Sequence, residues 1–144
     1  MTQTLSKEGI QFLKEREGFR SKAYLDGGGV WTIGYGHTGS DVHKDSVITE
    51  EQGESLLKDD LIESEDAVNT LVIVPLSNNQ FTVLVSFCFN IGSTAFSKST
   101  LLKVLNQGLY ANVPVELKKW NHIHQVNDQG LTNRRQLEIQ LWNS

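Results

Sequence analysis

The segment from residue 77 to residue 92 constrains the fold more than any other part of the chain. Ser77 and Gln80 have the spacing of a capping box, in which each side chain bonds the other residue's backbone N–H at a helix start. The run that follows, residues 81–91, is apolar on nearly every side until Gly92 ends it. A helix without a polar face has to be covered by other elements. The sequence therefore predicts a buried central helix inside a helical lobe.

Further helices are predicted on both sides of this segment. Ser6 as the N-cap and Gly18 as the residue after the last turn bound a short helix over about residues 6–17. A second capping box, at Thr49 and Gln52, opens a long helix that Pro75 prevents from continuing. The inner stripe of that helix is Leu57, Leu61, Ser64, Val68 and Leu71, with Leu56, Asp60 and Ala67 beside it. The other predicted helices, which make the second half of the chain all-helical, cover about residues 98–107, 114–121 and 133–142.

The segment from residue 22 to residue 37 is typical of a β-hairpin. Two strand-like runs flank the turn Asp26-Gly27-Gly28-Gly29. Strand alternation puts the bulky side chains on one face, which we expect to pack inward: Trp31, Ile33, Tyr35 and His37. Thr32 lies on the opposite face with small residues, and we expect that face to line a surface that a ligand can approach closely.

Composition and charge exclude several classes of protein. The single cysteine, Cys88, rules out an internal disulfide and a multi-cysteine metal site, and its apolar neighbours indicate inert core filling. No apolar run approaches the roughly 20 residues of a membrane span, and the first residues lack the apolar block of a secretory signal. The net charge of −4 argues against a nucleic-acid binder. That charge is uneven, −7 over residues 1–97 and +3 over residues 98–144.

Glu17, Asp26 and Thr32 are the residues on which the sequence places chemistry. Hydrolysis of a glycosidic bond needs one protonated carboxyl group and one ionised carboxylate. Glu17 follows the apolar stripe of Ile10 and Leu13 at a helix C-terminus, where burial and the helix dipole both disfavour its anion. Asp26 stands at a strand-to-turn junction whose backbone N–H groups can stabilise an anion, and the Thr32 hydroxyl can hold a water beside it. The alternative interpretation is a solvated helix end and an ordinary turn residue.

The residues around these three positions resemble the phage-type lysozymes, glycoside hydrolase family 24. The matching blocks, in chain order, are Glu17-Gly18-Phe19-Arg20, Ala23-Tyr24-Leu25-Asp26, Trp31-Thr32-Ile33-Gly34-Tyr35-Gly36-His37-Thr38, Val74-Pro75-Leu76-Ser77-Asn78-Asn79-Gln80, Phe89-Asn90-Ile91-Gly92 and Gly130-Leu131-Thr132-Asn133-Arg134-Arg135. The resemblance implies an α+β, mainly helical fold with a small β-hairpin lobe and a larger helical lobe joined by the long helix. We expect one lysozyme-like catalytic domain over residues 1–144, its small lobe at about 18–60 and its large lobe at about 61–144 plus the N-terminal helix.

The resemblance also implies an activity. The chain would be a phage endolysin, a muramidase that hydrolyses the β-1,4 bond between N-acetylmuramic acid and N-acetylglucosamine in bacterial peptidoglycan and so lyses the host cell. Glu17 would be the general acid, and Asp26 and Thr32 would hold the attacking water, which implies inversion at the anomeric carbon. The cleft between the lobes would bind the glycan, and no cofactor is expected.

Other residues are expected to support this site. His37 resembles a structural histidine that pairs with an acid on the long helix, and Asp60 is the matching candidate. Such a pair raises the pKa of His37, and the stability it adds fades as the pH climbs through the folded-state pKa. Arg134 matches the arginine that faces the catalytic acid, which leaves Arg135 for the surface or the glycan. The positions that line the family's sugar-binding cleft are Thr38, Phe89, which also suits a core, and Thr100, which also suits a helix cap.

A metal site is not expected. His122-Ile123-His124 has the spacing of metal ligands and His43 lies elsewhere, but no acidic or thiol ligand stands at a fixed spacing from them. The stretch of residues 121–128 fits the family pattern poorly.

Two other functions on the same scaffold stay open at this point, a catalytically silent glycan-binding module and a lytic transglycosylase. The intact Glu17, Asp26 and Thr32 argue against the first, and a water held by Asp26 and Thr32 argues against the second. The partners expected are peptidoglycan glycan strands and a phage holin, which gives access to the wall without forming a stable complex. We expect a monomer that binds neither nucleic acid nor membrane, accumulates in the host cytoplasm and reaches the wall after membrane permeabilisation.

Overall fold

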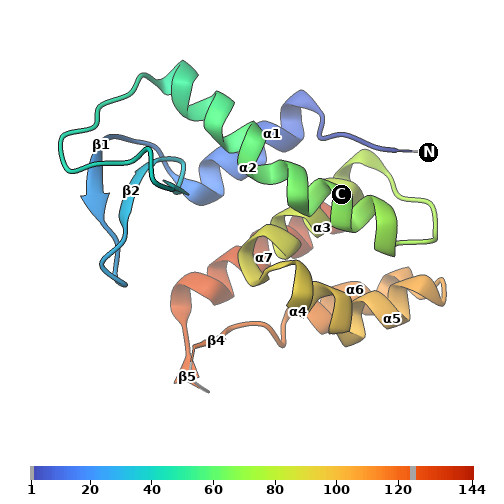
Figure 1. Ribbon diagram of the computed structural model, residues 1–144. Helices are drawn as coiled ribbons and strands as arrows, with labels where there is room; N and C mark the ends of the chain where they lie inside the picture. The colour runs from blue at the N-terminus through green and yellow to red at the C-terminus, as the bar shows by residue number, and fades with distance from the viewer. Residues whose placement is uncertain (1, 124–125) are drawn as a thin grey trace. The chain divides into compact units, whose positions relative to one another are not determined.

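The computed structural model describes residues 2–123 and 126–144 (Figure 1). Its helices and strands, in chain order, are α1 (Lys7–Glu17), β1 (Arg20–Leu25), β2 (Trp31–Gly34), β3 (His37–Thr38), α2 (Glu50–Leu71), α3 (Asn78–Ile91), α4 (Ser93–Lys98), α5 (Thr100–Asn106), the 3-10 helix η1 (Tyr110–Asn112), α6 (Val113–Leu117), β4 (His122–Ile123), β5 (Val126–Asn127) and α7 (Gln129–Trp142). Helices predominate and the sheets are small and antiparallel, which confirms the α+β, mainly helical class. Among the described residues, no helix has both the length and the apolar character that crossing a bilayer requires.

The fold divides into two compact units. One consists of residues 10–62, and the other of the residues up to Gly9 together with residues 63–144. The boundaries fall inside α1 and α2, so each of these helices contributes residues to both units. The single catalytic domain with a small lobe at about residues 18–60 stays a prediction.

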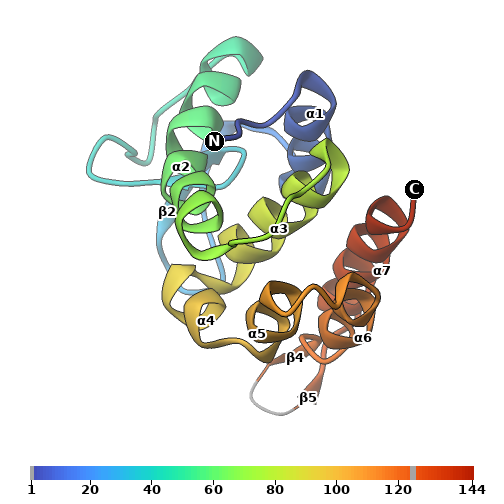
Figure 2. The same ribbon diagram turned by 90° about the vertical axis from the view of Figure 1, so that its right-hand side faces the viewer.

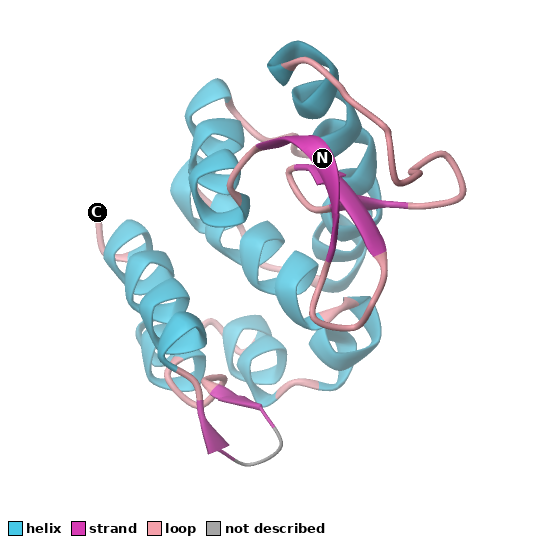
Figure 3. Cartoon of the chain, turned by 90° about the vertical axis from the view of Figure 1, so that its left-hand side faces the viewer, coloured by secondary structure: helices cyan, strands magenta, loops and turns pink. Residues whose placement is uncertain are grey.

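A three-stranded antiparallel sheet, in the order β1-β2-β3, belongs to the 10–62 unit (Figure 3). Arg20 on β1 faces Gly34 on β2, and Tyr24 faces Thr32, so β1 has two more residues than β2 between these pairs. The register therefore shifts at a bulge in β1, which increases local twist.

The bulged part of β1 bonds to a loop on its outer side. The Ile48 N–H donates to the Ser21 carbonyl (2.9 Å), and the Ala23 N–H donates to the Ser46 carbonyl (3.0 Å). Residues 46–48, which we call the covering segment, thus pair with the edge of β1 that β2 does not occupy.

The second strand of the hairpin was expected to continue to His37, and this prediction is wrong because β2 ends at Gly34. The chain turns at Tyr35 and Gly36 and returns as β3, so that His37 lies opposite Ile33. Gly34 (φ +64°) and Gly36 (φ +82°) have left-handed backbones, which glycine adopts without the steric penalty of a Cβ atom. The alternation of faces predicted from the sequence therefore ends at Gly34.

The small face predicted around Thr32 is covered only in part, because Val30 and Gly36 on the same face are exposed. Thr32 is only 4% exposed, and Gly34 is buried. A Cβ atom built on Gly34 would lie 3.1 Å from the Ile48 side chain and 3.4 Å from the Gly53 backbone. The small residues on this face let the loop and α2 approach the strand closely.

The other unit is built around α3, as the sequence predicts. Ser77 and Gln80 form the capping box, and every residue from Phe81 to Cys88 is buried. Figure 2 shows α3 running beside α4, and α7 also packs against it. Gly92 (φ +93°) ends the helix by donating its N–H to the Cys88 carbonyl (2.8 Å).

The second half of the chain differs from the prediction in five places. α4 is an extra helix, and the predicted helix of residues 114–121 is the shorter α6. Ser99 caps α5 through the Leu102 N–H (3.1 Å), so Thr100 is the first helical residue and the cap expected of it is wrong. α7 begins earlier than expected because Asp128 caps it. The β4–β5 ribbon overturns the all-helical second half.

Candidate active site

Glu17 is the last residue of α1, at the C-terminal end of the helix, where the sequence predicts it. Leu13 on the same stripe is fully buried, and Glu17 itself is half-buried. Gly18 (φ +71°) ends the helix and donates its N–H to the Lys14 carbonyl (2.9 Å). The Glu17 carboxylate lies beside the turn between β2 and β3, because a Cβ atom built on Gly36 would be 3.8 Å from its Oε1.

Asp26 follows β1 directly and is exposed, in contrast to Glu17. Its Oδ1 accepts hydrogen bonds from the backbone N–H groups of Gly28 (2.8 Å) and Val30 (2.9 Å). These bonds fix the carboxylate in the glycine-rich turn and satisfy one of its oxygens. The stabilising backbone donors predicted from the sequence are present.

The Val30 carbonyl joins Asp26 to Thr32. It accepts the Asp26 backbone N–H (3.0 Å) and the Thr32 hydroxyl (3.0 Å). Since the Thr32 hydroxyl proton is committed to this carbonyl, its Oγ1 lone pairs are the groups that remain to accept a hydrogen bond. One carbonyl thus sets the positions of both residues predicted to hold the water.

His37 lies between two carboxylates. Its Nδ1 is 2.8 Å from Asp60 Oδ2, the predicted partner, and its Nε2 is 3.0 Å from Asp41 Oδ2. Partial burial alone lowers the pKa of His37, but the bonds to Asp60 and Asp41 outweigh it and raise the pKa. The bond from His37 in turn lowers the pKa of Asp41. We call these three residues the His37 clamp. Sequence reasoning missed Asp41, which lies four residues after His37.

A second charged network in the 10–62 unit was also missed by sequence reasoning. The Tyr35 hydroxyl donates to Glu50 Oε2 (2.8 Å), and Lys14 Nζ pairs with the same oxygen (3.1 Å) and with Glu54. Burial and the bond to Glu50 raise the pKa of Tyr35, and the bond to Glu54 raises that of Lys14. The pKa of Glu50 is lowered, first by the hydrogen bond from the Tyr35 hydroxyl and second by the bond from Lys14. We call these four residues the Lys14 network.

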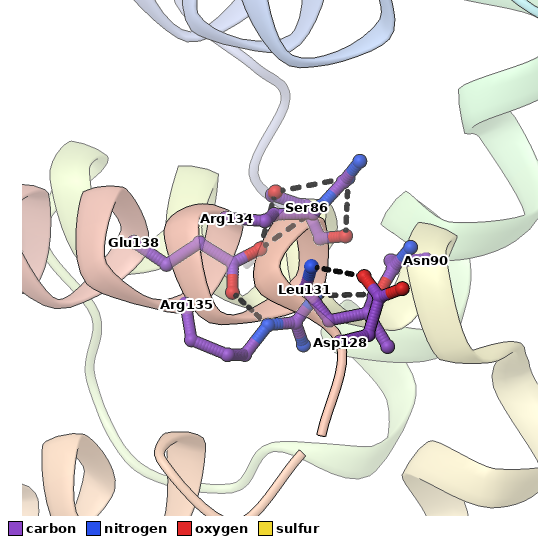
Figure 4. Close-up of polar contacts among 7 residues, drawn as sticks. All are labelled: Ser86, Asn90, Asp128, Leu131, Arg134, Arg135 and Glu138. Carbon is purple, nitrogen blue, oxygen red and sulfur yellow. Dashed lines mark hydrogen bonds and ion pairs between the residues drawn. The ribbon is translucent and has the colours of Figure 1, made fainter. Parts of the chain in front are cut away.

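A buried polar group surrounds Arg134 in the other unit (Figure 4). The Ser86 hydroxyl donates to Glu138 Oε2 (2.6 Å), and Arg134 Nη2 donates to the Ser86 carbonyl (3.1 Å) and hydroxyl oxygen (3.2 Å). Arg134 Nε lies 3.5 Å from Glu138 Oε2. Arg135 pairs with Glu138 Oε1 (3.0 Å) and donates to the Asn90 side chain. We call these five residues the Glu138 cluster.

The surface or glycan role predicted for Arg135 is wrong. Arg135 is 1% exposed, with its guanidinium over the Phe87 ring at 5.0 Å from the centroid. It is buried because Glu138 supplies a charged partner inside the core and the exposed Asn90 supplies a polar partner at the edge of the core. Burial raises the pKa of Glu138 and lowers the pKa of Arg135.

The predicted sugar-binding residues come from both units. Thr38, in β3, is exposed. Phe89, near the end of α3, is half-buried, and Thr100, at the start of α5, is exposed. Their contact with a glycan stays a prediction, as does the pairing of Arg134 with the catalytic acid.

Two further expectations concern the histidine pair at residues 122 and 124 and the single cysteine, Cys88. His124 lies outside the described residues, and the described residues contain no group of three or more metal-ligating side chains. Cys88 is fully buried, and burial raises the pKa of its thiol, in agreement with core filling.

Comparison with known proteins identifies the family of the chain. The sequence model described as phage lysozyme matches residues 14–138. The chain belongs to the phage lysozyme family. An endolysin of Acyrthosiphon pisum secondary endosymbiont phage 1 is 43% identical to it over 97% of this chain and 98% of that protein. The chain spans about half the length of two other similar endolysins, from Bacillus phages B103 and PZA.

Solved structures of lysozymes resemble this phage lysozyme family member closely. A mutant of P22 lysozyme superposes with a TM-score of 0.91 at 42% identity, covering 99% of each chain. The muramidase domain of SpmX from Asticaccaulis excentricus has a TM-score of 0.91 at 36% identity, covering 98% of each chain. The chain is thus a lysozyme-type hydrolase, and the endolysins that it resembles come from phages.

Proposed function

We propose that this lysozyme-type hydrolase is an endolysin that cleaves the β-1,4 bond between N-acetylmuramic acid and N-acetylglucosamine in bacterial peptidoglycan, and so lyses the host cell. The observation that carries the proposal is the Val30 carbonyl, which bonds both the Asp26 backbone and the Thr32 hydroxyl. Membership of the phage lysozyme family and similarity to a muramidase domain support it.

Glu17 and Asp26 take different parts in this reaction because their surroundings differ. Glu17, half-buried at the end of α1, acts as the general acid and protonates the leaving glycosidic oxygen. Asp26 is exposed and bonded by two backbone N–H groups, which suits a carboxylate that stays ionised. Two carboxyl groups in unlike environments supply the acid and the base that glycoside hydrolysis needs.

Asp26 and Thr32 orient the attacking water. One water proton is donated to the Asp26 carboxylate, which removes it as the water attacks. The other is donated to Thr32 Oγ1, because the hydroxyl proton of Thr32 is bonded to Val30. The oxygen lone pair of the water then points at the anomeric carbon, and attack from the face opposite the leaving group inverts its configuration.

The remaining roles follow from this reaction. Arg134 acts on the catalytic acid, and Thr38, Phe89 and Thr100 bind sugar, without a metal or a cofactor in the reaction. The enzyme acts as a monomer on peptidoglycan glycan strands. It is made in the host cytoplasm and reaches the wall once a holin has permeabilised the membrane.

The test is digestion of purified peptidoglycan, with products analysed by mass spectrometry and by NMR of the first-formed anomer. We expect a hydrated reducing end of inverted configuration, and no cleavage by Glu17→Gln or Asp26→Asn. An anhydro end would identify a lytic transglycosylase, and no product from the native enzyme would identify a glycan-binding module. Full activity of Glu17→Gln, with its circular dichroism spectrum unchanged, would overturn the assignment of the acid.

A further inference from the structure

Tyr35 occupies a central position among the residues around Glu17, although its own side chain bears no group that the reaction uses. It is only 7% exposed and lies in the turn between β2 and β3. The residue after it, Gly36, is the one whose Cβ position lies 3.8 Å from Glu17 Oε1. The position of Tyr35 therefore sets the distance between this turn and the acid.

The hydroxyl end of Tyr35 is tied to α1 before Glu17. It donates to Glu50 Oε2, and this oxygen also pairs with Lys14, three residues before Glu17 on the same helix. Residues three apart lie on the same side of a helix. The ammonium of Lys14 also lies 5.9 Å from the centroid of the Tyr35 ring.

The ring of Tyr35 is tied to the chain just after Glu17. It packs against Phe19 with 5.3 Å between the ring centroids. Both rings rest on Gly53 of α2, where an added Cβ atom would lie 2.7 Å from Phe19 and 3.6 Å from Tyr35. One side chain thus contacts α1, α2 and the segment that follows α1.

From these contacts we infer that Tyr35 is a positioning residue for Glu17, holding the turn of residues 34–36 against the end of α1 so that the acid reaches the leaving oxygen. This inference rests on the proposed function, in which Glu17 is the general acid. Tyr35 touches no reacting atom and acts through the turn. A misplacement of about 1 Å in a catalytic group lowers rates by as much as ~100-fold, so a loosened turn should be visible in kcat.

The test compares two leaving groups on the same peptidoglycan-derived oligosaccharide, the natural sugar and 4-nitrophenol. Nitrophenolate departs without being protonated, so a defect in the general acid costs little with it. We expect Tyr35→Phe to lower kcat on the natural glycan about tenfold at unchanged KM, and the loss to shrink to about twofold or less with nitrophenol. A purely structural role would lower both rates by the same factor.

Matched variants separate the hydroxyl bond from general effects. Tyr110→Phe also removes one tyrosine hydroxyl bond, the exposed one to the Pro75 carbonyl (2.7 Å), and should leave both rates unchanged. Glu50→Gln retains an acceptor for Tyr35 but loses the charge that pairs with Lys14, and should keep most of kcat. Tyr35→Leu, which also loses the Phe19 contact, should lose more than Tyr35→Phe with the same dependence on leaving group.

Two outcomes would contradict different statements. Equal kcat for Tyr35→Phe and the native enzyme on the natural glycan, with Glu17→Gln inactive, overturns the role of Tyr35 alone. An active Glu17→Gln overturns the proposed function itself. Thermal unfolding of each variant, measured beside the kinetics, shows that the rates come from folded protein.

Discussion

Both units of this lysozyme-type hydrolase contain charged networks, but the two networks of the 10–62 unit are open to water, whereas the ion pair at the centre of the Glu138 cluster is buried. Asp41 in the His37 clamp and Glu50 in the Lys14 network have side chains that are 63% and 50% exposed. In the Glu138 cluster, Arg135 and Glu138 are 1% and 0% exposed. The same ion-pair chemistry is therefore used in two dielectric settings.

The difference between these settings decides what each network can contribute. Exposed ion pairs add little stability, because water solvates each partner well when the pair is broken. A buried pair has already lost that solvation, so breaking it leaves an uncompensated charge in the core. Arg135 Nη1 has no hydrogen-bond partner among the described residues, so this cluster has little polar contact to spare. The exposed networks are thus suited to adjusting local geometry, and the Glu138 cluster to fixing one arrangement of α3 and α7.

The largest expected effect comes from breaking the buried cluster. Glu138→Leu removes the only acid in the cluster and leaves Arg135 charged in the core, which should lower the free energy of unfolding by about 3–5 kcal/mol. Urea denaturation measures this loss. The matched variant is Glu54→Gln, which removes a partner of Lys14 whose side chain is 33% exposed, and it should leave the midpoint nearly unchanged. Similar losses for the two variants would remove the distinction between the settings.

A smaller effect is expected from two glycines with the same backbone conformation, one in each unit. Gly36 and Gly108 both have φ +82°, so alanine at either position should cost about 1–2 kcal/mol of strain. A Cβ atom at Gly108 would meet nothing within 4 Å, whereas at Gly36 it would meet Glu17. Only Gly36→Ala should therefore lower kcat on peptidoglycan. If both variants lose activity equally, contact with Glu17 is not the cause.

The smallest effect concerns pH and the His37 clamp. Because the folded-state pKa of His37 is raised above its ordinary value of 6.5, the clamp stabilises the fold fully below about pH 6.5. This stability, ~1 kcal/mol, is lost as the pH rises through the folded-state pKa. The free energy of unfolding of the native enzyme should exceed that of Asp60→Asn at pH 5.5, and the two values should converge at high pH. An unshifted His37 in an NMR titration would contradict the clamp.

Features set by neighbouring residues were predictable from the sequence. The capping boxes at Ser77 and Thr49, the glycine after α1 and the Asp26 turn all depend on contacts within about five residues. The partnership of His37 with Asp60 was predictable because a family resemblance supplied a contact that lies 23 residues away along the chain.

Features that depend on distant partners were not predictable in the same way. Arginine is rarely buried, and Arg135 is buried because Asn90 and Phe87, far away in sequence, lie against it. The early end of β2 depends on left-handed backbone angles at Gly34 and Gly36, which glycine permits but does not require. Strand alternation predicted that Tyr35 faces inward, but it gave no sign of the hydrogen bond from the Tyr35 hydroxyl to Glu50, which the structure shows.

The covering segment of residues 46–48 has a consequence for how the protein behaves at high concentration. An uncovered edge strand offers its backbone groups to other chains and promotes aggregation. Here the Ser21 carbonyl and the Ala23 N–H are already bonded by this segment, and the Ser46 N–H is itself anchored to the His43 carbonyl (3.0 Å). Pairing of two molecules through β1 would first require this segment to detach, so the hairpin that carries Asp26 is protected from forming intermolecular sheets.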